Sequence, residues 1–449
     1  MITKFVNREN ELKALNDAYK KQTFSFYPIY GRRRVGKTEL IKQFIKDKPH
    51  IYFLATEGTE KENITNFKNA AKNVTNLSFI KDDFEEIFIY LTQNVQKRTI
   101  IIIDEFPFLI KANKSISSLF QSIIDLHLSE SNIFLILCGS SIGMMYKEVL
   151  GYKAPLYGRR TGQIELNPLF FKDVIKLLNK PVEECVRIYG VCGAVPFYLK
   201  EFVEKKDFFQ LIEEKVISRE AILNKEAIFL LREELDEVSR YSSMIGAISL
   251  GYTKLGEIMN YCGFKDKLNI TPYLHVLERL GIIEKEVSIT SGMRARGVYK
   301  IKDAFFKFYF RYVRPNESMI ENNMKEISAS IEKDYDTYLG EVFEHISKEL
   351  LTKKHYFSKI GRWWHKEEEI DLVGLNENKK QITFFECKWK NLSYNASLKI
   401  LGDLKEKADF VKWLNKQRKE QYGLIAKKIE NKEDLRKKGF LVYDLDDWK

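Results

Sequence analysis

The chain has 449 residues, too many for one hydrophobic core, so we expect two to four domains. With 44% hydrophobic and 31% charged residues it has the composition of a globular protein, and its formal net charge of +11 permits nucleic acid as a partner without requiring it. Five cysteines without a CxxC pair exclude a disulfide framework and a cysteine zinc site. No stretch reaches the roughly 18 apolar residues of a membrane span and no signal-peptide core is visible, so we expect a cytoplasmic protein without a membrane partner.

Residues 24–166 contain short apolar runs that alternate with longer helical patterns, which is typical of buried parallel strands with helical crossovers. We expect strands at residues 24–30, 51–54, 100–103, 133–138 and 163–166. The pattern from residue 170 to about 240 is helical. The sequence therefore predicts an α/β fold with a P-loop NTPase parallel sheet over residues 1–168 and a helical lid over residues 169–240.

A phosphate-binding motif follows the first expected strand. The pattern GxxxxGK[ST] is matched by Gly31-Arg32-Arg33-Arg34-Val35-Gly36-Lys37-Thr38, and the next helix continues from Glu39. Glycines let backbone N–H groups wrap phosphates, the lysine neutralises their charge, and the threonine hydroxyl ligates Mg²⁺. The motif predicts ATP and Mg²⁺ as cofactors.

Two carboxylates end the apolar strand at residues 100–103. We expect Asp104 to hold the magnesium shell and Glu105 to polarise the attacking water, because both lie at the carboxyl edge of the sheet beside the P-loop. Ser140 follows the next strand, where it either senses the γ-phosphate or forms an ordinary Gly-Ser turn. Arg159 either reaches the transferred phosphate or is a surface residue.

The remaining sequence predicts two further domains. Residues 241–313 give three helices followed by two β-type runs, which is a winged-helix order, with the wing arginines Arg294 and Arg296 as candidate phosphate contacts. An intramolecular or protein-docking role is the alternative to DNA binding. The polar stretch 314–326 is the expected linker. Residues 331–449 then predict a small α/β domain.

The C-terminal domain carries a candidate nuclease site. Glu386 and Lys388 are two residues apart on one expected strand and share a face, and the preceding strand brings Asp371 alongside. Two carboxylates can hold Mg²⁺ against a phosphodiester while a lysine orients the attacking water. A salt-bridged strand face is the structural alternative.

Several motifs together resemble the archaeal branch of the STAND ATPases within the AAA+ class. They are the phosphate motif, the two strand-end carboxylates, and the runs at 5–12, 139–141, 156–160 and 193–199. The resemblance implies that Arg8 lies near the nucleotide base or the P-loop and that Pro196 packs on the adenine. It also leaves open a homo-oligomer.

The C-terminal residues resemble the PD-(D/E)xK nuclease fold, a restriction-endonuclease-like domain. Glu344, within Gly340-Glu-Val-Phe-Glu344, matches its first-helix acid, and Gly361-Arg-Trp-Trp364 matches its lead-in. The resemblance implies a metal set of Glu344, Asp371 and Glu386. Our hypothesis is an ATP-hydrolysing switch that acts on nucleic acid, most simply DNA, through this nuclease-like domain. The alternative is a regulatory or scaffold ATPase that cleaves nothing.

Overall fold

The computed structural model describes residues 5–292 and 295–448. The chain forms two compact units, Phe5–Pro168 and Leu169–Lys449. Among the helices in the described part, none combines the length and apolar content that a membrane crossing needs.

The first unit is built on a five-stranded parallel sheet in the order β2-β3-β4-β1-β5. The strands are β1 (Ser25–Tyr30), β2 (His50–Leu54), β3 (Ile100–Asp104), β4 (Phe134–Gly139) and β5 (Ile164–Glu165). All five lie where the apolar runs predicted them. Strand β4 lies between β1 and β3, so the P-loop strand and the strand that ends in Asp104 are separated by one neighbour.

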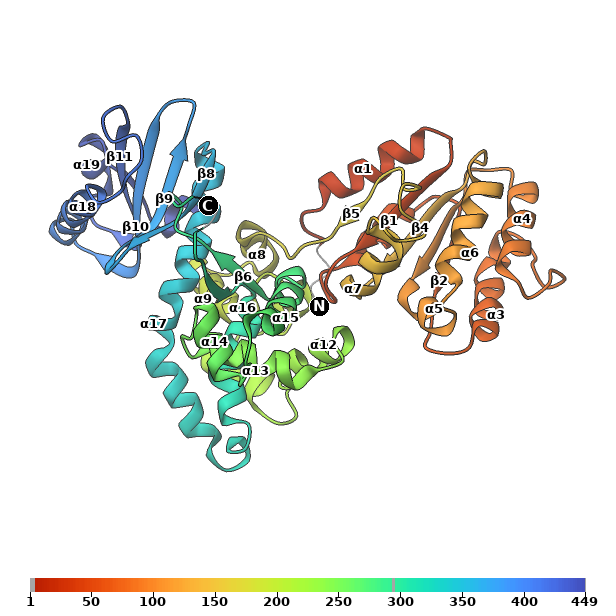
Figure 1. The fold of residues 1–449 in the computed structure, drawn as a ribbon, viewed down its shortest axis with the longest axis horizontal. Helices are drawn as coiled ribbons and strands as arrows, with labels where there is room; N and C mark the ends of the chain where they lie inside the picture. The colour runs from red at the N-terminus through yellow and green to blue at the C-terminus, as the bar shows by residue number, and fades with distance from the viewer. Residues whose placement is uncertain (1–4, 293–294, 449) are drawn as a thin grey trace. The chain divides into compact units, whose positions relative to one another are not determined.

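Helices cover both faces of this sheet (Figure 1). Helices α1 (Glu9–Lys20) and α2 (Lys37–Ile45) pack on one face through Leu15, Leu40 and Phe44. The opposite face is covered by α3 (Glu60–Ala70), α4 (Phe84–Asn94), α5 (Phe106–Ala112) and α6 (Ile116–Ile123). Burial on both faces explains why β3 and β4 are apolar without alternation. A short helix, α7 (Ile142–Met145), follows β4.

The second unit begins with helices. They are α8 (Phe171–Leu178), α9 (Val182–Cys192), α10 (Pro196–Lys200), α11 (Phe208–Ile212) and α12 (Glu226–Glu234). Three more helices and an antiparallel strand pair follow in the predicted winged-helix order: α13 (Val238–Ser249), α14 (Leu255–Tyr261), α15 (Lys267–Arg279), β6 (Ile283–Glu286) and β7 (Val298–Ile301). Helix α16 (Ala304–Phe308) comes next.

The expected linker at residues 314–326 is wrong from Ile320 onward, because helix α17 runs from Ile320 to Lys354 with a kink at Asn323. The physical reason is a buried apolar stripe at helical spacing within a polar composition: Ile320, Ile327, Ile331, Tyr335, Tyr338 and Val342. Tyr335 and Tyr338 each donate a hydrogen bond of 2.6 Å to backbone carbonyls of α9, at Arg187 and Gly190. Helix α17 therefore ties α9 to the C-terminal sheet.

The C-terminal sheet has the order β12-β11-β10-β9-β8. Its strands are β8 (Lys359–His365), β9 (Glu368–Asn376), β10 (Gln381–Leu392), β11 (Lys419–Ile429) and β12 (Leu441–Tyr443). The first three pair antiparallel as hairpins, and β10, β11 and β12 pair in parallel. Helices α18 (Tyr394–Ala408) and α19 (Lys432–Lys437) make the crossovers. The fold class predicted from sequence, a P-loop sheet with a separate small α/β sheet, is confirmed.

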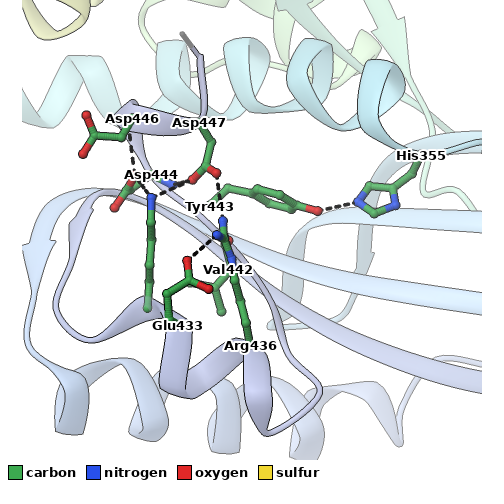
Figure 2. Close-up of polar contacts among 9 residues, drawn as sticks. His355, Glu433, Arg436, Val442, Tyr443, Asp444, Asp446 and Asp447 are labelled. Carbon is green, nitrogen blue, oxygen red and sulfur yellow. Dashed lines mark hydrogen bonds and ion pairs between the residues drawn. The ribbon is translucent and has the colours of Figure 1, made fainter.

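Ion pairs fix the last turn of the chain against helix α19, as Figure 2 shows. Arg436 donates to Asp447 at 2.8 Å, and Lys432 donates to Asp444 at 2.6 Å. Beside them, Tyr443 and His355 share a hydrogen bond of 2.7 Å. The ring of Trp448 meets Phe171 of α8 edge-on at 4.8 Å between centroids, so the chain end also contacts the first helix of this unit.

The wing of the winged-helix segment packs against β8 of the C-terminal sheet. The backbone N–H of Ile289 donates to the carbonyl of Arg362 at 3.0 Å, and the N–H of Trp364 donates to the Ser288 hydroxyl at 3.1 Å. The Ile289 side chain packs on the core cluster that contains Trp363. Part of the wing therefore makes an intramolecular contact with the C-terminal sheet. Of the two arginines predicted to contact phosphate, Arg296 is exposed and Arg294 lies outside the described residues.

Candidate active sites

The P-loop requires glycine at both ends. Gly31 has a φ of +143°, and a Cβ there would lie 2.3 Å from the backbone oxygen of Leu166. Gly36 has a φ of +99° and precedes the first turn of α2. Arg34 also takes a positive φ, 70°, so the loop curls tightly between β1 and α2. A loop with this backbone conformation is concave, and its amide N–H groups can point toward a phosphate.

Lys37 lies inside the loop. Its ammonium donates to the carbonyls of Gly31 at 2.8 Å and Arg32 at 3.0 Å, and the residue is only 6% exposed. The side chain is therefore held where phosphate charge would lie. Glu39, by contrast, is exposed and accepts a hydrogen bond from Gln43 at 2.9 Å on the outer face of α2.

Of the other loop residues, Arg33 is exposed, Arg32 and Arg34 are half-buried, and Val35 is buried. The nucleotide-binding roles of these residues stay predictions.

Thr38 and Asp104 form the magnesium part of the site. The Thr38 hydroxyl donates to Asp104 Oδ2 at 2.9 Å, and the backbone N–H of Glu105 donates to Oδ1 at 3.0 Å. Asp104 is 2% exposed, whereas Thr38 is an exposed residue. Hydroxyl and carboxylate oxygens are the hard donors that Mg²⁺ prefers. These two residues fit the ion that the motif implies.

Glu105 is held by the neighbouring strand end. Ser140 donates to Glu105 Oε2 from its hydroxyl at 2.8 Å and from its backbone N–H at 3.3 Å. Glu105 has a left-handed backbone with a φ of 55°, an uncommon conformation for this residue type that turns its carboxylate toward Ser140. Ser140 therefore positions the predicted water-polarising carboxylate, a role more specific than a Gly-Ser turn.

The two arginines predicted near the nucleotide make different contacts. Arg8 donates to the carbonyls of Val35 at 3.3 Å and Asn167 at 2.6 Å, which ties the chain before α1 to the P-loop. Arg159 binds the Asp125 carboxylate at 2.8 Å. The guanidinium of Arg159 is thus held by a carboxylate in the connection between α6 and β4. To contact a phosphate, it would have to leave this ion pair.

Pro196 is the first residue of α10 and is half-buried. Its contact with adenine stays a prediction.

The predicted nuclease residues converge on the C-terminal sheet. Asp371 lies on β9, and Glu386 and Lys388 lie on β10. The ammonium of Lys388 donates to Glu386 at 2.5 Å and to Asp371 at 3.2 Å, while the backbone N–H of Cys387 donates to Asp371 at 2.8 Å. Both carboxylates are buried. The hairpin therefore brings the trio together as the strand pattern predicted.

Glu344 on α17 belongs to the same electrostatic cluster. Burial and then the charge of Asp371 raise the pKa of Glu344 to about 7. Burial and Asp371 likewise raise the pKa of Glu386. Burial lowers the pKa of Lys388, but Asp371 and Glu386 outweigh it, so its pKa lies above the ordinary value. Crowded carboxylates of this kind favour a cation or a proton between them.

Comparisons with known proteins identify the family. A family model described as an ATPase domain predominantly from Archaea matches residues 5–202, and one described as "Archaea bacterial proteins of unknown function" matches residues 309–400. An uncharacterized protein of Methanocaldococcus jannaschii is 43% identical over 454 residues, covering 99% of this chain and 100% of that protein. The chain belongs to this family of archaeal-type P-loop ATPases.

One further similarity agrees with the ATPase assignment, and another concerns the fold alone. An uncharacterized ATP-binding protein of the same organism is 47% identical over 47 residues, which cover 10% of this chain and 80% of that protein. A solved Walker-type ATPase of Pyrococcus abyssi has a TM-score of 0.54 and 22% identity, covering 68% of this chain and 96% of that chain. The second similarity shows the fold.

Sequence reasoning missed two cations near the carboxylate cluster of this ATPase. Lys407 on α18 donates to the second oxygen of Glu386 at 3.0 Å. Arg362 on β8 binds Glu369 at 2.6 Å, and the charge of Glu344 helps to raise its pKa. Lys407 comes from a crossover helix that no motif marked, and Arg362 lies in the Gly361–Trp364 run but was given no role from the sequence. Only the folded sheet places them there.

The metal set predicted for this cluster, Glu344, Asp371 and Glu386, stays a prediction. In the described ranges, 5–292 and 295–448, no group of three or more His, Cys, Asp or Glu side chains is arranged to hold a metal ion. Ammonium groups from Lys388 and Lys407 lie against Glu386.

Proposed function

We propose that this ATPase is a nucleotide-driven switch that acts on nucleic acid and that its C-terminal sheet is a magnesium-dependent nuclease domain. In this proposal the chain is a STAND-type AAA+ protein with an ATPase core (1–168), a helical lid (169–240), a winged helix (241–313) and a PD-(D/E)xK domain (331–449). Two copies assembling as a homo-oligomer are compatible with it. The described cysteines are free thiols, which supports the expected cytoplasmic location.

At the P-loop, this chain's residues would bind and orient the nucleotide. Lys37 holds its ammonium where β and γ phosphates would lie, and Thr38 and Asp104 would hold magnesium. Magnesium would neutralise the phosphate charge that develops during hydrolysis. Glu105, positioned by Ser140, would orient the attacking water.

At the C-terminal cluster, Asp371 and Glu386 would hold magnesium and Lys388 would orient water against a phosphodiester. The observation that carries this proposal is the Lys388 ammonium within hydrogen-bond distance of both buried carboxylates, with Glu344 close enough for Asp371 to raise its pKa. Such a set of oxygen donors beside a lysine suits the chemistry of phosphodiester cleavage. The basic net charge of +11 favours a polyanionic substrate.

A second candidate function is a regulatory ATPase that cleaves nothing. The favouring observation is that Lys388 and Lys407 neutralise Glu386 from both sides, which is also how a purely structural ion-pair network looks.

Incubation of supercoiled plasmid and single-stranded DNA with the full chain, ATP and either Mg²⁺ or EDTA separates the two functions. The nuclease proposal predicts Mg²⁺-dependent nicking or cutting that Asp371→Ala abolishes and that Asp403→Ala, at an exposed carboxylate on α18, leaves intact. Nicking that is absent from the wild type, or equal in Asp371→Ala, leaves the regulatory ATPase. Lys37→Ala then tests whether ATP gates the cleavage.

A further inference from the structure

Tyr52 on β2 contacts the magnesium part of the ATP site, although no motif marks it. Its hydroxyl donates to Asp104 Oδ2 at 2.5 Å, the same oxygen that accepts the Thr38 hydroxyl at 2.9 Å. The other oxygen, Oδ1, accepts the backbone N–H of Glu105 at 3.0 Å. Three donors, from β2, from α2 and from the residue that follows β3, therefore fix the plane of one carboxylate that is only 2% exposed.

Building on the magnesium role proposed above for Asp104, we propose that Tyr52 is a positioning residue that fixes Asp104 for magnesium and thereby couples magnesium to nucleotide binding. A carboxylate that supports a metal ion or its water must present one oxygen in a fixed direction, and outer donors supply that orientation. The Thr38 hydroxyl donates to the same carboxylate, but its oxygen would also ligate the ion, so the orientation it supplies is tied to the ligand itself. Tyr52 offers a donor that has no ligand role of its own.

Strand pairing does not need this hydroxyl. Residues His50–Leu54 pair with Ile100–Asp104 through the backbone along the whole of β2, and the Tyr52 ring packs on the core that α1 and α2 cover. A phenol is protonated at neutral pH, so the Tyr52 hydroxyl is available as a donor to Asp104. The aromatic ring therefore serves packing, and the hydroxyl serves the carboxylate.

The test is calorimetric titration of ADP into the full chain, once with Mg²⁺ and once with EDTA. The dissociation constant of ADP in EDTA, divided by the dissociation constant with Mg²⁺, measures how strongly magnesium supports nucleotide binding. Tyr52→Phe should lower this ratio by about 10-fold, the loss typical of an outer-shell partner, while the ADP affinity in EDTA stays within about twofold of wild type. In an Asp104→Asn background, the same substitution should add no further loss.

The matched control is Tyr19→Phe. Tyr19 packs on the same core, and its hydroxyl donates to the carbonyl of Arg98 at 3.1 Å, away from Asp104. It should leave the ratio unchanged, and both variants should melt within about 3 °C of wild type. The proposal is overturned if Tyr52→Phe keeps the wild-type ratio, if it weakens ADP equally with Mg²⁺ and EDTA, or if Tyr19→Phe has the same effect.

Discussion

The P-loop site and the C-terminal carboxylate cluster both place a lysine where phosphate chemistry would occur, but they hold that lysine in different ways. At the P-loop, Lys37 is bound by backbone carbonyls of its own loop. At the cluster, Lys388 is bound by the carboxylates of Glu386 and Asp371, which come from two strands. The first site is organised by backbone conformation and the second by opposing charges. Changes to backbone freedom should therefore break the first, and changes to charge should break the second.

The largest effect should come from Gly31→Ala at the P-loop. A Cβ placed 2.3 Å from the Leu166 oxygen forces β1 and β5 apart, which should destabilise the first unit by about 3 kcal/mol and abolish ADP binding. Thermal melting and ADP titration measure both. The control is Gly256→Ala on α14, where a Cβ meets nothing within 4 Å and the helix should gain about 0.5 to 1 kcal/mol. Unchanged melting and binding in Gly31→Ala would contradict a backbone-built site.

Next in size is Glu105→Gln. Removing the carboxylate that Ser140 positions should lower the rate of ATP hydrolysis about 100-fold and leave ADP affinity unchanged, because the amide keeps the shape but accepts no proton. Steady-state phosphate release measures the rate. Glu130→Gln, an exposed change in the same unit, should hydrolyse ATP like wild type. Wild-type hydrolysis by Glu105→Gln would remove Glu105 from the mechanism.

A smaller effect is the pH dependence of the carboxylate cluster. The pKa of Glu344 is raised to about 7 in the folded chain, above its ordinary value near 4.5, so the folded state binds the extra proton between these values. The free energy of unfolding should therefore fall as pH rises from about 4.5 to 7. Glu344→Gln lacks this titration, so between pH 5 and pH 8 its free energy of unfolding should fall by about 2 kcal/mol less than that of the wild type.

Urea midpoints of the two proteins at pH 5 and pH 8 measure this difference. Glu332→Gln, at an exposed position on the same helix, should keep the wild-type pH dependence. A pH dependence in Glu344→Gln that equals the wild type would show that crowded charge does not govern the cluster.

The smallest effect should come from the wing. Ile289→Ser removes an apolar contact with the Trp363 cluster but keeps the backbone hydrogen bond to Arg362, so the second unit should lose about 1 kcal/mol. Thermal melting measures the change, with Ser291→Ala on the exposed part of the wing as the control. If Ile289→Ser melts like the control, the wing does not pack on the C-terminal sheet in solution.

The same contrast explains what could be predicted from sequence. The P-loop strand, the loop and α2 are contiguous, and the carboxylates follow an apolar strand, so local pattern was sufficient to place Lys37, Thr38 and Asp104 at the same edge of the sheet, while their roles stay predictions. The pairing of Asp371 with Glu386 was also accessible, because β9 and β10 are consecutive and joined by a short turn.

Contacts that depend on tertiary packing were not accessible. Tyr52 reaches Asp104 across neighbouring strands, and Lys407 reaches Glu386 from a crossover helix. The packing of Ile289 against β8 likewise follows no local rule. The linker error at 314–326 differs in kind, since the helical spacing of Ile320, Ile327 and Ile331 was present but masked by the polar residues between them.

Titration of ADP with Mg²⁺ into the wild-type chain and Lys37→Ala tests the central claim most directly. Saturable binding by the wild type that weakens about 100-fold in Lys37→Ala is the predicted result, because a buried ammonium bound to phosphate contributes about that much affinity. Heat of binding that is absent from the wild type, or identical in the two proteins, would contradict the assignment of residues 31–38 as the nucleotide site.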